Sequence, residues 1–378
     1  MGYLISAFND NNKTITIYSF PVQKGKIMHE VTIGIPVYNA VPYLKATLLS
    51  ALTQSFESIE YLIVDDKSTD NSMEIISELQ HMHPRGKNIR VIQHLQNSGP
   101  AIARNTILKE TKSNYLFLLD GDDLLTADCI ELLYNAITDS NSDVVYASYK
   151  EEWRDDNVSE RESLRTLPPL IFEGENELAL FTYKSLRQSF RYFVWNVLYS
   201  THFLYENKIK FEQVRYWEDF AFSFDLIPHV RKAIFLPNIT YIYVKHAESI
   251  SQYYTRKRIS HEEISEHIKI RQLCKKKCTM HKEKPYFDVR VTQTSIMCID
   301  TAAVILDKKN MYDFKMPNKE LKELLKHPLL LKEILKFKRY RALNILLYLF
   351  GNIPFLINKL LLRLYFYILK KHRKWKKK

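Results

Sequence analysis

Apolar runs of six to nine residues alternate with amphipathic stretches along the first third of the chain. The runs have the length and composition of buried strands and cover residues 31–39, 61–66, 89–94 and 115–120. The intervening stretches repeat apolar residues at helical spacing and cover residues 43–54, 68–80 and 99–110. Strands that alternate with helices in this way favour a mostly parallel sheet covered on both faces, with right-handed crossovers.

Carboxylates stand directly at the ends of two of these strands. Asp65 and Asp66 end the second strand, and Asp120, Asp122 and Asp123 follow the fourth in the stretch LFLLDGDDLL. The carboxyl ends of parallel strands share one edge of a sheet, where ligands bind, so we expect one crevice to hold both groups. Adjacent carboxylates repel one another unless positive charge lies among them. The alternative is an Asp-Gly turn that caps the next helix.

The alternation weakens after residue 126. Residues 128–137 and 176–186 have helical patterns, and residues 143–153 have that of a strand. The charged stretch 153–170, which ends in two prolines, predicts a flexible loop, and residues 233–251 predict a pair of strands. From about residue 256 the pattern is helical and basic to the end.

Six ordered pieces of the sequence resemble family 2 glycosyltransferases of the GT-A fold. The resemblance covers roughly residues 30–252, and its pieces are IGIPVYNAVPYLKATLLSALTQSF, YLIVDDKSTDNS, NSGPAIARN, LLDGDD, WEDFAF (217–222) and HAESIS (246–251), together with the WN pair at 195–196. It implies an α/β protein with a mostly parallel, Rossmann-like central sheet. The domains expected are an N-terminal extension of uncertain status (1–27, with Met28 as a possible start), a nucleotide-sugar-binding half (28–125), an acceptor-binding half (126–255) and a helical basic region (256–378).

The resemblance implies where a nucleotide-sugar donor, expected to be a UDP-sugar, would bind. The residues that match such a site are Pro36, Tyr38, Asn39, Asp65, Asp66, Arg104, Asp120, Gly121 and Asp122. Pro36 and Tyr38 match positions that contact the base, Asp66 matches the carboxylate that accepts the uracil imide hydrogen, and Arg104 matches an arginine near the base and phosphates. Arg104 as a solvated helix charge and Asp66 as a helix N-cap remain alternatives.

The same resemblance implies a divalent cation, Mn²⁺ or Mg²⁺, bound by oxygen ligands. Asp122 is the expected ligand, Asp123 a possible second one, and His246 matches a histidine that completes the metal shell in related enzymes. Asp120 is expected to face the ribose or the waters of the metal. A cation that bridges the diphosphate to carboxylates would neutralise both and stabilise the leaving nucleoside diphosphate. His246 as an ordinary surface histidine is the alternative.

A general base is expected in WEDFAF, because the acceptor hydroxyl must lose a proton as it attacks the anomeric carbon. Asp219 matches the catalytic base of the family, and Glu218 lies beside it. One in-line displacement inverts the anomeric centre, so an inverting hexosyltransferase is implied. The alternative is an acidic pair at a helix N-terminus. Trp195 and Trp217 are candidates for sugar stacking or for core packing.

The charge of the chain is divided unevenly. Residues 256–378 carry a net +20 and the first 255 residues a net −8. The stretch 341–378 combines an uncharged run too short to be a convincing span with Lys359 and Arg363 on one face of a leucine-rich helix, and ends in a polybasic tail. We expect it to lie on an anionic membrane surface, and its leucines argue against nucleic acid. A packed helical domain or a homodimer contact remains the alternative.

Other functions and sites fit the sequence less well. A nucleotidyltransferase would carry a Gly-rich phosphate loop near its start, and a non-catalytic scaffold would not need Asp66, Asp122, Asp219 and His246 all intact. His267, Cys274, Cys278 and His281 lie too far apart along one helix to meet at zinc. The four cysteines form no disulfide framework, and no signal peptide is evident. The expectation is a cytoplasmic enzyme, peripheral on the inner face of the membrane, that acts on a saccharide or lipid-linked saccharide in surface-polysaccharide synthesis.

Overall fold

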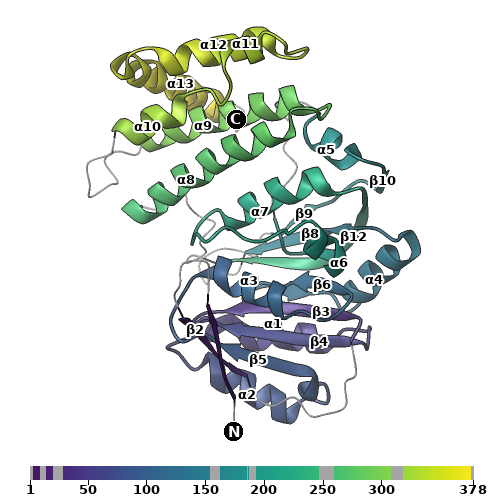
Figure 1. Ribbon diagram of the computed structural model, residues 1–378. Helices are drawn as coiled ribbons and strands as arrows, with labels where there is room; N and C mark the ends of the chain where they lie inside the picture. Colours follow the sequence, from purple (N-terminus) through teal and green to yellow (C-terminus); the bar gives the residue numbers. More distant parts are fainter. Residues whose placement is uncertain are drawn as a thin grey trace. The chain divides into compact units, whose positions relative to one another are not determined.

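The computed structural model describes residues 3–8, 14–19, 29–153, 162–184, 186, 193–246, 259–307 and 318–375 (Figure 1). The chain divides into two compact units. The first contains residues Met1–Leu178 and Tyr192–Ser249, and the second contains Ala179–Arg191 and Ile250–Lys378. Most of the expected halves on either side of residue 125 belongs to the first unit and shares one sheet, whereas Ala179–Arg191 belongs to the second unit.

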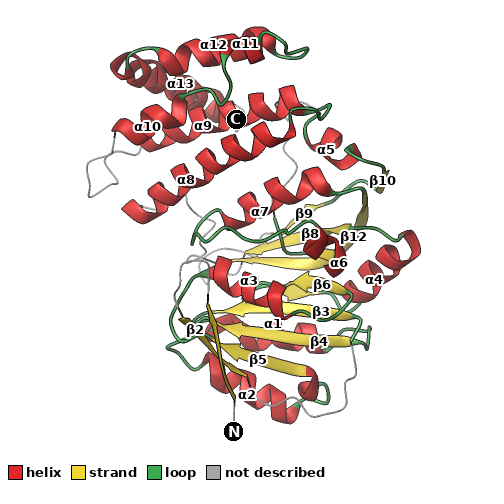
Figure 2. Cartoon of the chain, in the orientation of Figure 1, coloured by secondary structure: helices red, strands yellow, loops and turns green. Residues whose placement is uncertain are grey.

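Four parallel strands form the centre of the first unit, in the order β5-β4-β3-β6. These strands are β3 (Val31–Val37), β4 (Ile59–Asp65), β5 (Ile89–Gln93) and β6 (Tyr115–Leu118). The crossovers contain α1 (Val41–Leu52), α2 (Ser72–Met82), a short 3-10 helix η1 (Gly86–Asn88) and α3 (Pro100–Glu110). Figure 2 shows helices in front of and behind these strands. The predicted alternation of strands and helices is therefore confirmed.

The core of this unit lies where β3 is covered on both faces. Val31, Ile33 and Ile35 are completely buried, as expected for a strand in the middle of a parallel sheet. Gly34 lets α3 approach closely, because a Cβ atom at this position would lie 2.3 Å from Cγ2 of Ile107.

The rest of the first unit extends the sheet beyond β6 as β11-β8-β12-β10. β11 runs antiparallel to both β6 and β8, while β12 runs parallel to β8, so the complete sheet is mixed. The strands are β7 (Leu124–Leu125), β8 (Val144–Trp153), β9 (Glu162–Arg165), β10 (Leu170–Glu173), β11 (Val197–Ser200) and β12 (Lys232–Lys245). The helices are α4 (Cys129–Ser140), α6 (Thr201–Glu206), α7 (Glu218–Leu226) and η2 (Ile227–His229). Helix α5 (Glu177–Thr182) begins in this unit and continues into the second.

Two predictions about this part of the chain are wrong. The expected loop at 153–170 contains β9, which pairs with β8 and is held by two contacts of 3.0 Å from Arg165 to Glu151. The expected strand pair at 233–251 is the single strand β12 over its described part. The register of its pairing with β8 shifts around Pro237. Proline cannot donate a hydrogen bond to the neighbouring strand, and a β-bulge accommodates it within β12.

The N-terminal extension contributes a hairpin of two strands. β1 (Tyr3–Phe8) and β2 (Thr14–Ser19) pair antiparallel, and β2 adds to the sheet edge at β5. Met28 lies outside the described residues, so the possible start there stays a prediction.

The second unit is helical, as the sequence predicts. Its helices are α8 (His261–Cys278), η4 (Thr279–His281), α9 (Phe287–Asp307), α10 (Asn318–Leu325), α11 (Leu331–Ile334), α12 (Arg341–Asn352) and α13 (Phe355–Trp375). Within the described part of the chain, α9 alone is long and apolar enough to cross a membrane, over Phe287–Leu306. Since 67% of that stretch is buried and α8, α10, α12 and α13 pack against it, α9 is the core helix of this unit.

Candidate active site

The carboxyl ends of β3 and β4 form the first wall of the site. Tyr38 is 49% exposed just beyond β3, where it can contact a ligand. The neighbouring Asn39 adopts a left-handed backbone (φ 48°), and its Oδ1 accepts a 2.7 Å hydrogen bond from the Thr69 amide. Pro36 lies at the same strand end, where a Cβ atom on Gly121 would come within 3.3 Å of its carbonyl oxygen. The loop after β6 therefore lies against the end of β3.

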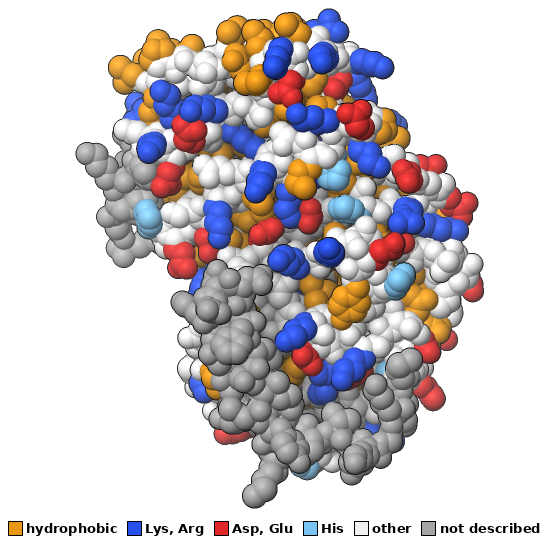
Figure 3. All heavy atoms as spheres, viewed as in Figure 1, with side chains coloured by type: hydrophobic (Ala, Val, Ile, Leu, Met, Phe, Trp, Pro, Cys, Tyr) orange, Lys and Arg blue, Asp and Glu red, His pale blue; other side chains and the backbone are white. Residues whose placement is uncertain are grey.

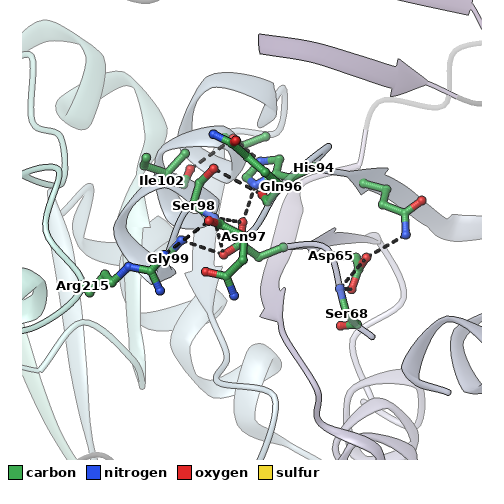
Figure 4. A network of polar contacts seen from close by, with 12 residues as sticks. Asp65, Ser68, His94, Gln96, Asn97, Ser98, Gly99, Ile102 and Arg215 are labelled. Carbon is green, nitrogen blue, oxygen red and sulfur yellow. Dashed lines mark hydrogen bonds and ion pairs between the residues drawn. The ribbon is translucent and has the colours of Figure 1, made fainter. Parts of the chain in front are cut away.

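Asp66 organises the loop that leads into α3, and Figure 4 labels the residues His94, Ser98 and Gly99 of this part of the chain. Its carboxylate accepts hydrogen bonds from the amides of Ser98 (2.9 Å) and Gly99 (2.7 Å), and the His94 ring nitrogen Nδ1 lies 2.7 Å away. Gly99 has φ +90°, a conformation that favours glycine, and it precedes the first turn of α3. With three contacts on a buried carboxylate, the geometry gives Asp66 a structural role, and the expected contact with uracil stays a prediction.

Asp65 is also engaged inside the protein. Its carboxylate accepts from the Ser68 amide at 3.2 Å and from Nε2 of Gln93 at 2.9 Å, and the residue is completely buried. It therefore fixes the turn after β4 rather than facing a ligand.

Arg104 joins three of the predicted site carboxylates. Its Nη2 lies 2.7 Å from Oδ1 of Asp120, and its Nη1 lies 2.7 Å from Oε1 of Glu218 and 3.0 Å from Oδ1 of Asp219. The residue is almost fully buried, so it is not a solvated helix charge. Burial by itself would lower the pKa of Arg104, but Asp219, Asp120 and Glu218 raise it well above its ordinary value. The guanidinium is therefore a permanent cation that links α3, the loop after β6 and the start of α7.

The pKa of Asp219 is shifted by burial and by the charged groups around it, as is common for catalytic acids and bases. Burial raises its pKa well above the usual range, Arg104 lowers it, and the neighbouring Glu218 and Asp120 raise it further. The preceding Trp217 holds a left-handed backbone (φ 68°), which is unusual for an aromatic residue and marks the start of α7. Glu218 and Asp219 both lie in the first turn of α7, so they are the acidic pair at a helix N-terminus that the sequence analysis gave as the alternative. This position is compatible with the expected role of Asp219 as the general base.

Asp122 and His246 meet across the site. Oδ2 of Asp122 lies 3.0 Å from Nε2 of His246, and the imidazole stacks on Tyr43 of α1 with ring centroids 4.4 Å apart. Burial and Asp120 raise the pKa of Asp122, whereas His246 lowers it. An oxygen and a nitrogen donor thus face each other at the position where a cation is expected. No group of three or more possible metal ligands gathers among the residues the structure describes.

Asp123 does not fit the predicted role of a second metal ligand. It is completely buried, and its oxygens accept from the hydroxyl of Tyr241 at 2.6 Å and from the amide of Val244 at 2.8 Å. Both partners belong to β12, and Val244 is two residues before His246. Asp123 therefore ties the loop that carries Asp122 to the strand that carries His246.

Trp195 does not fit the predicted role in sugar stacking. It is 8% exposed, and the rings of Phe193, Tyr241 and Tyr243 stack on it with centroids 4.5, 4.8 and 5.2 Å away. Its faces are occupied by the aromatic core, so it supports β12 instead. Trp217 remains a candidate.

Two residues of the site, Tyr43 and Tyr241, were not predicted. Tyr43 lies on the helical repeat of α1 and gives no separate signal in the sequence. Tyr241 alternates with other aromatic residues along β12, and only its contact with Asp123 distinguishes it. Both are recognisable only when α1, β12 and the loop after β6 are brought together.

Comparison with known proteins places this arrangement in a family. Residues 32–209 match the family model described as glycosyl transferase family 2. The chain is 34% identical over 154 residues to poly(ribitol-phosphate) beta-N-acetylglucosaminyltransferase TarP of Staphylococcus aureus (strain N315), covering 39% of this chain and 42% of that protein. It is 27% identical over 229 residues to the minor teichoic acid biosynthesis protein GgaA of Bacillus subtilis (strain 168), covering 58% and 48%. The matches thus span less than half of these relatives.

A solved structure shares the fold. The structure of S. aureus TarS 1–349 in complex with UDP-GlcNAc has a TM-score of 0.54 and 17% identity, and the match covers 85% of this chain and 90% of that one. Together with the family model and the sheet order, this likeness establishes the GT-A fold. Residues 32–209 of the chain therefore form a domain of the glycosyl transferase family 2.

Proposed function

We propose that the chain is an inverting transferase that moves a sugar from a UDP-sugar to a hydroxyl of a saccharide or lipid-linked saccharide in surface-polysaccharide synthesis. The observation that carries this proposal is the cluster of Arg104 with Asp120, Glu218 and Asp219, next to the Asp122–His246 pair. One guanidinium faces three carboxylates, and Asp122 adds a fourth. The excess negative charge suits a divalent cation and a donor diphosphate bound together.

The residues present fit Mn²⁺ or Mg²⁺ in this position. Asp122 and His246 would hold the cation, with donor phosphate oxygens and water completing its shell. Bound there, the cation would stabilise the negative charge that develops on the departing nucleoside diphosphate. Arg104 fits the same assignment, because its buried Nε has no hydrogen-bond partner among the described residues.

The chain's own residues supply the proton chemistry. The carboxylate of Asp219 takes the proton of the acceptor hydroxyl while that oxygen bonds to the anomeric carbon. At the same time the bond from that carbon to the diphosphate breaks, and the nucleoside diphosphate leaves with its electron pair. Arg104 orients Asp219, and Glu218 and burial keep its pKa raised enough to accept a proton.

The names of relatives narrow the substrates to be tested. TarP is named as an N-acetylglucosaminyltransferase on poly(ribitol-phosphate), and GgaA is named for teichoic acid biosynthesis. UDP-N-acetylglucosamine is therefore the first donor to test. The acceptor class comprises saccharides and polyol-phosphate chains, including those attached to lipid at the inner face of the membrane.

A panel of nucleotide sugars with Mn²⁺ and a soluble saccharide acceptor tests the proposal. One donor should support transfer, and Asp219→Asn should reduce that transfer by about 10²–10⁴-fold, the usual contribution of a general base. Calorimetry should show that the same variant still binds UDP, because Asp219 does not hold the donor in this assignment. Near-full transfer by Asp219→Asn would remove it as the base.

A further inference from the structure

Leucine side chains point outward on the last two helices of the second unit. On α13, Leu356, Leu360 and Leu364 are 74%, 60% and 57% exposed, and they follow one another at helical spacing. On α12, Leu346 and Leu349 are exposed in the same way, opposite the buried Leu347. Of the large hydrophobic side chains that are exposed among the described residues, about half lie between residues 330 and 367. Hydrophobic side chains gather over α11, α12 and α13 in Figure 3.

The inner faces of the same helices are fixed by polar contacts. The buried Asn344 of α12 donates to Oγ1 of Thr292 on α9 at 2.7 Å, and Tyr365 of α13 donates to Oδ1 of Asp300 on α9, also at 2.7 Å. Asn358 of α13 donates to the carbonyl of Phe350 on α12 at 2.6 Å. These contacts fix the rotation of each helix about its axis. The outward leucines therefore cannot be buried by a simple rotation of α12 or α13.

An ordinary surface helix buries its leucines and exposes mainly polar residues, whereas α12 and α13 bury Leu347 and Leu362 and also leave leucines on the outer face. Of the expectations for residues 341–378, packing within a helical unit is confirmed, and contact with a membrane stays a prediction. The helices pack within their unit through one face and leave the other face apolar. Deleting them would uncover α9, so substitutions on the outer face are the better test.

The basic residues around the outward leucines indicate which kind of partner this face binds. Residues 326–378 contain fifteen Lys and Arg but one acidic residue, Glu333, which pairs with Lys282 at 2.7 Å. A second copy of this face would bring like charges together, and a nucleic acid would leave the leucines without an apolar partner. An apolar strip among basic residues is complementary to a bilayer with anionic headgroups.

We propose that the outer faces of α12 and α13 form a membrane-docking surface for anionic lipid, with both helices lying in the plane of the interface. The outer face is defined here by Leu346, Leu349, Leu356, Leu360 and Leu364. Lys359 and Arg363 on α13 supply charge beside the leucines. The inference extends the membrane location in the proposed function by naming the surface that contacts lipid, and its test does not depend on transfer.

Vesicle sedimentation of the full chain tests the surface. The outer-face variant is Leu356→Gln, Leu360→Gln and Leu364→Gln. The matched control is Met82→Gln, Leu164→Gln and Met280→Gln, which changes side chains that are 76%, 62% and 73% exposed elsewhere. The vesicles are phosphatidylcholine with phosphatidylglycerol, and phosphatidylcholine alone.

The wild type and the control should sediment with the anionic vesicles and bind phosphatidylcholine weakly. The outer-face variant should partition at least about tenfold less, because three leucine side chains no longer enter the interface. Salt should weaken wild-type binding only in part, since it screens charge and not apolar burial. Unchanged circular dichroism would show that the variant is folded, and unchanged transfer to a soluble acceptor would show that the active site is intact.

Equal sedimentation of the variant and the wild type would overturn the proposal. So would a change from dimer to monomer by light scattering without a change in vesicle binding, which would identify a contact between copies. Loss of RNA binding by Lys359→Gln with Arg363→Gln, without loss of vesicle binding, would point to nucleic acid instead. Failure of every donor in the transfer assay would leave these outcomes unaffected, so the two proposals fail separately.

Discussion

Asp219 and Glu218 share the guanidinium of Arg104, and this shared contact controls how the proposed base titrates. A base works only when it is unprotonated, so transfer should rise as pH increases through the pKa of Asp219. Because burial and Glu218 raise that pKa while Arg104 lowers it, the rise should come above the ordinary range of an aspartate.

Glu218→Gln should move this acidic limb to lower pH. The substitution removes a negative charge next to Asp219, so the ionised form of Asp219 meets less repulsion while Arg104 still stabilises it, and its pKa falls. The measurement is the pH profile of kcat/KM for transfer to a soluble acceptor. A shift to higher pH would contradict the coupling, and a loss of transfer at every pH would make Glu218 the base.

Asp122→Ala should remove the Mn²⁺-dependent part of UDP affinity. The diphosphate would then lack the carboxylate through which the cation joins it to the protein. His246→Ala should weaken the same affinity less, because an imidazole can be replaced in the metal shell by water. Calorimetry with and without Mn²⁺ measures both, and Asp139→Ala, an exposed aspartate on α4, is the control. Unchanged Mn²⁺ dependence in Asp122→Ala would refute the assignment.

At the scale of elements, β12 connects the aromatic core to the site. Tyr241 stacks on Trp195 and donates to Asp123, Val244 donates to the same carboxylate, and His246 follows at the end of the strand. The bulge at Pro237 lets one continuous strand make all these contacts while it stays paired with β8. The position of His246 relative to Asp122 is therefore set by the contacts that Asp123, next to Asp122, makes with Tyr241 and Val244 on β12.

Asp123→Asn and Tyr241→Phe should each weaken Mn²⁺-dependent UDP binding. Both remove a hydrogen bond that holds the loop after β6 to β12, and loss of such supporting contacts typically costs about 10–100-fold in metal affinity. Binding of UDP without metal should change little. Tyr205→Phe is the control, because that hydroxyl donates to backbone carbonyls of Leu108 and Thr111 away from the loop. An equal loss in the control would mean that general destabilisation is the cause.

At the scale of the whole molecule, the net charge of the chain changes sign close to residue 250, where the second unit resumes. The first 255 residues carry a net −8 and hold the site, whereas residues 256–378 carry a net +20 and include the outer face. Attraction to an anionic surface would act mainly on the second unit, and it decays over about 8–10 Å at moderate ionic strength. The net negative charge of the first 255 residues would not add to this attraction.

The outer-face variant should therefore separate two activities of the full chain. Transfer to a soluble saccharide should equal that of the wild type. Transfer to the same saccharide attached to lipid in anionic vesicles should fall, with the loss in KM rather than in kcat, since only the encounter at the membrane is affected. Equal rates on vesicles would mean that the lipid-linked acceptor does not depend on this surface.

The sequence by itself determined the alternation of strands and helices, the carboxylates at the strand ends and the family. These features are local, because a strand or a helix shows its period within a few residues, and the motifs are short. The edge at which Asp65, Asp66 and Asp120 gather also followed from chain order, since the ends of parallel strands share one edge.

Only the tertiary structure decided which groups those residues contact. Arg104 meets Glu218 and Asp219 across 114 and 115 positions of the chain, and Asp123 turns to β12 instead of to a cation. Trp195 is closed in by rings from other parts of the first unit, and α13 presents its leucines outward because α9 fixes its opposite face. Such contacts depend on how distant elements pack and on the rotation of each helix about its axis, which a local pattern does not contain.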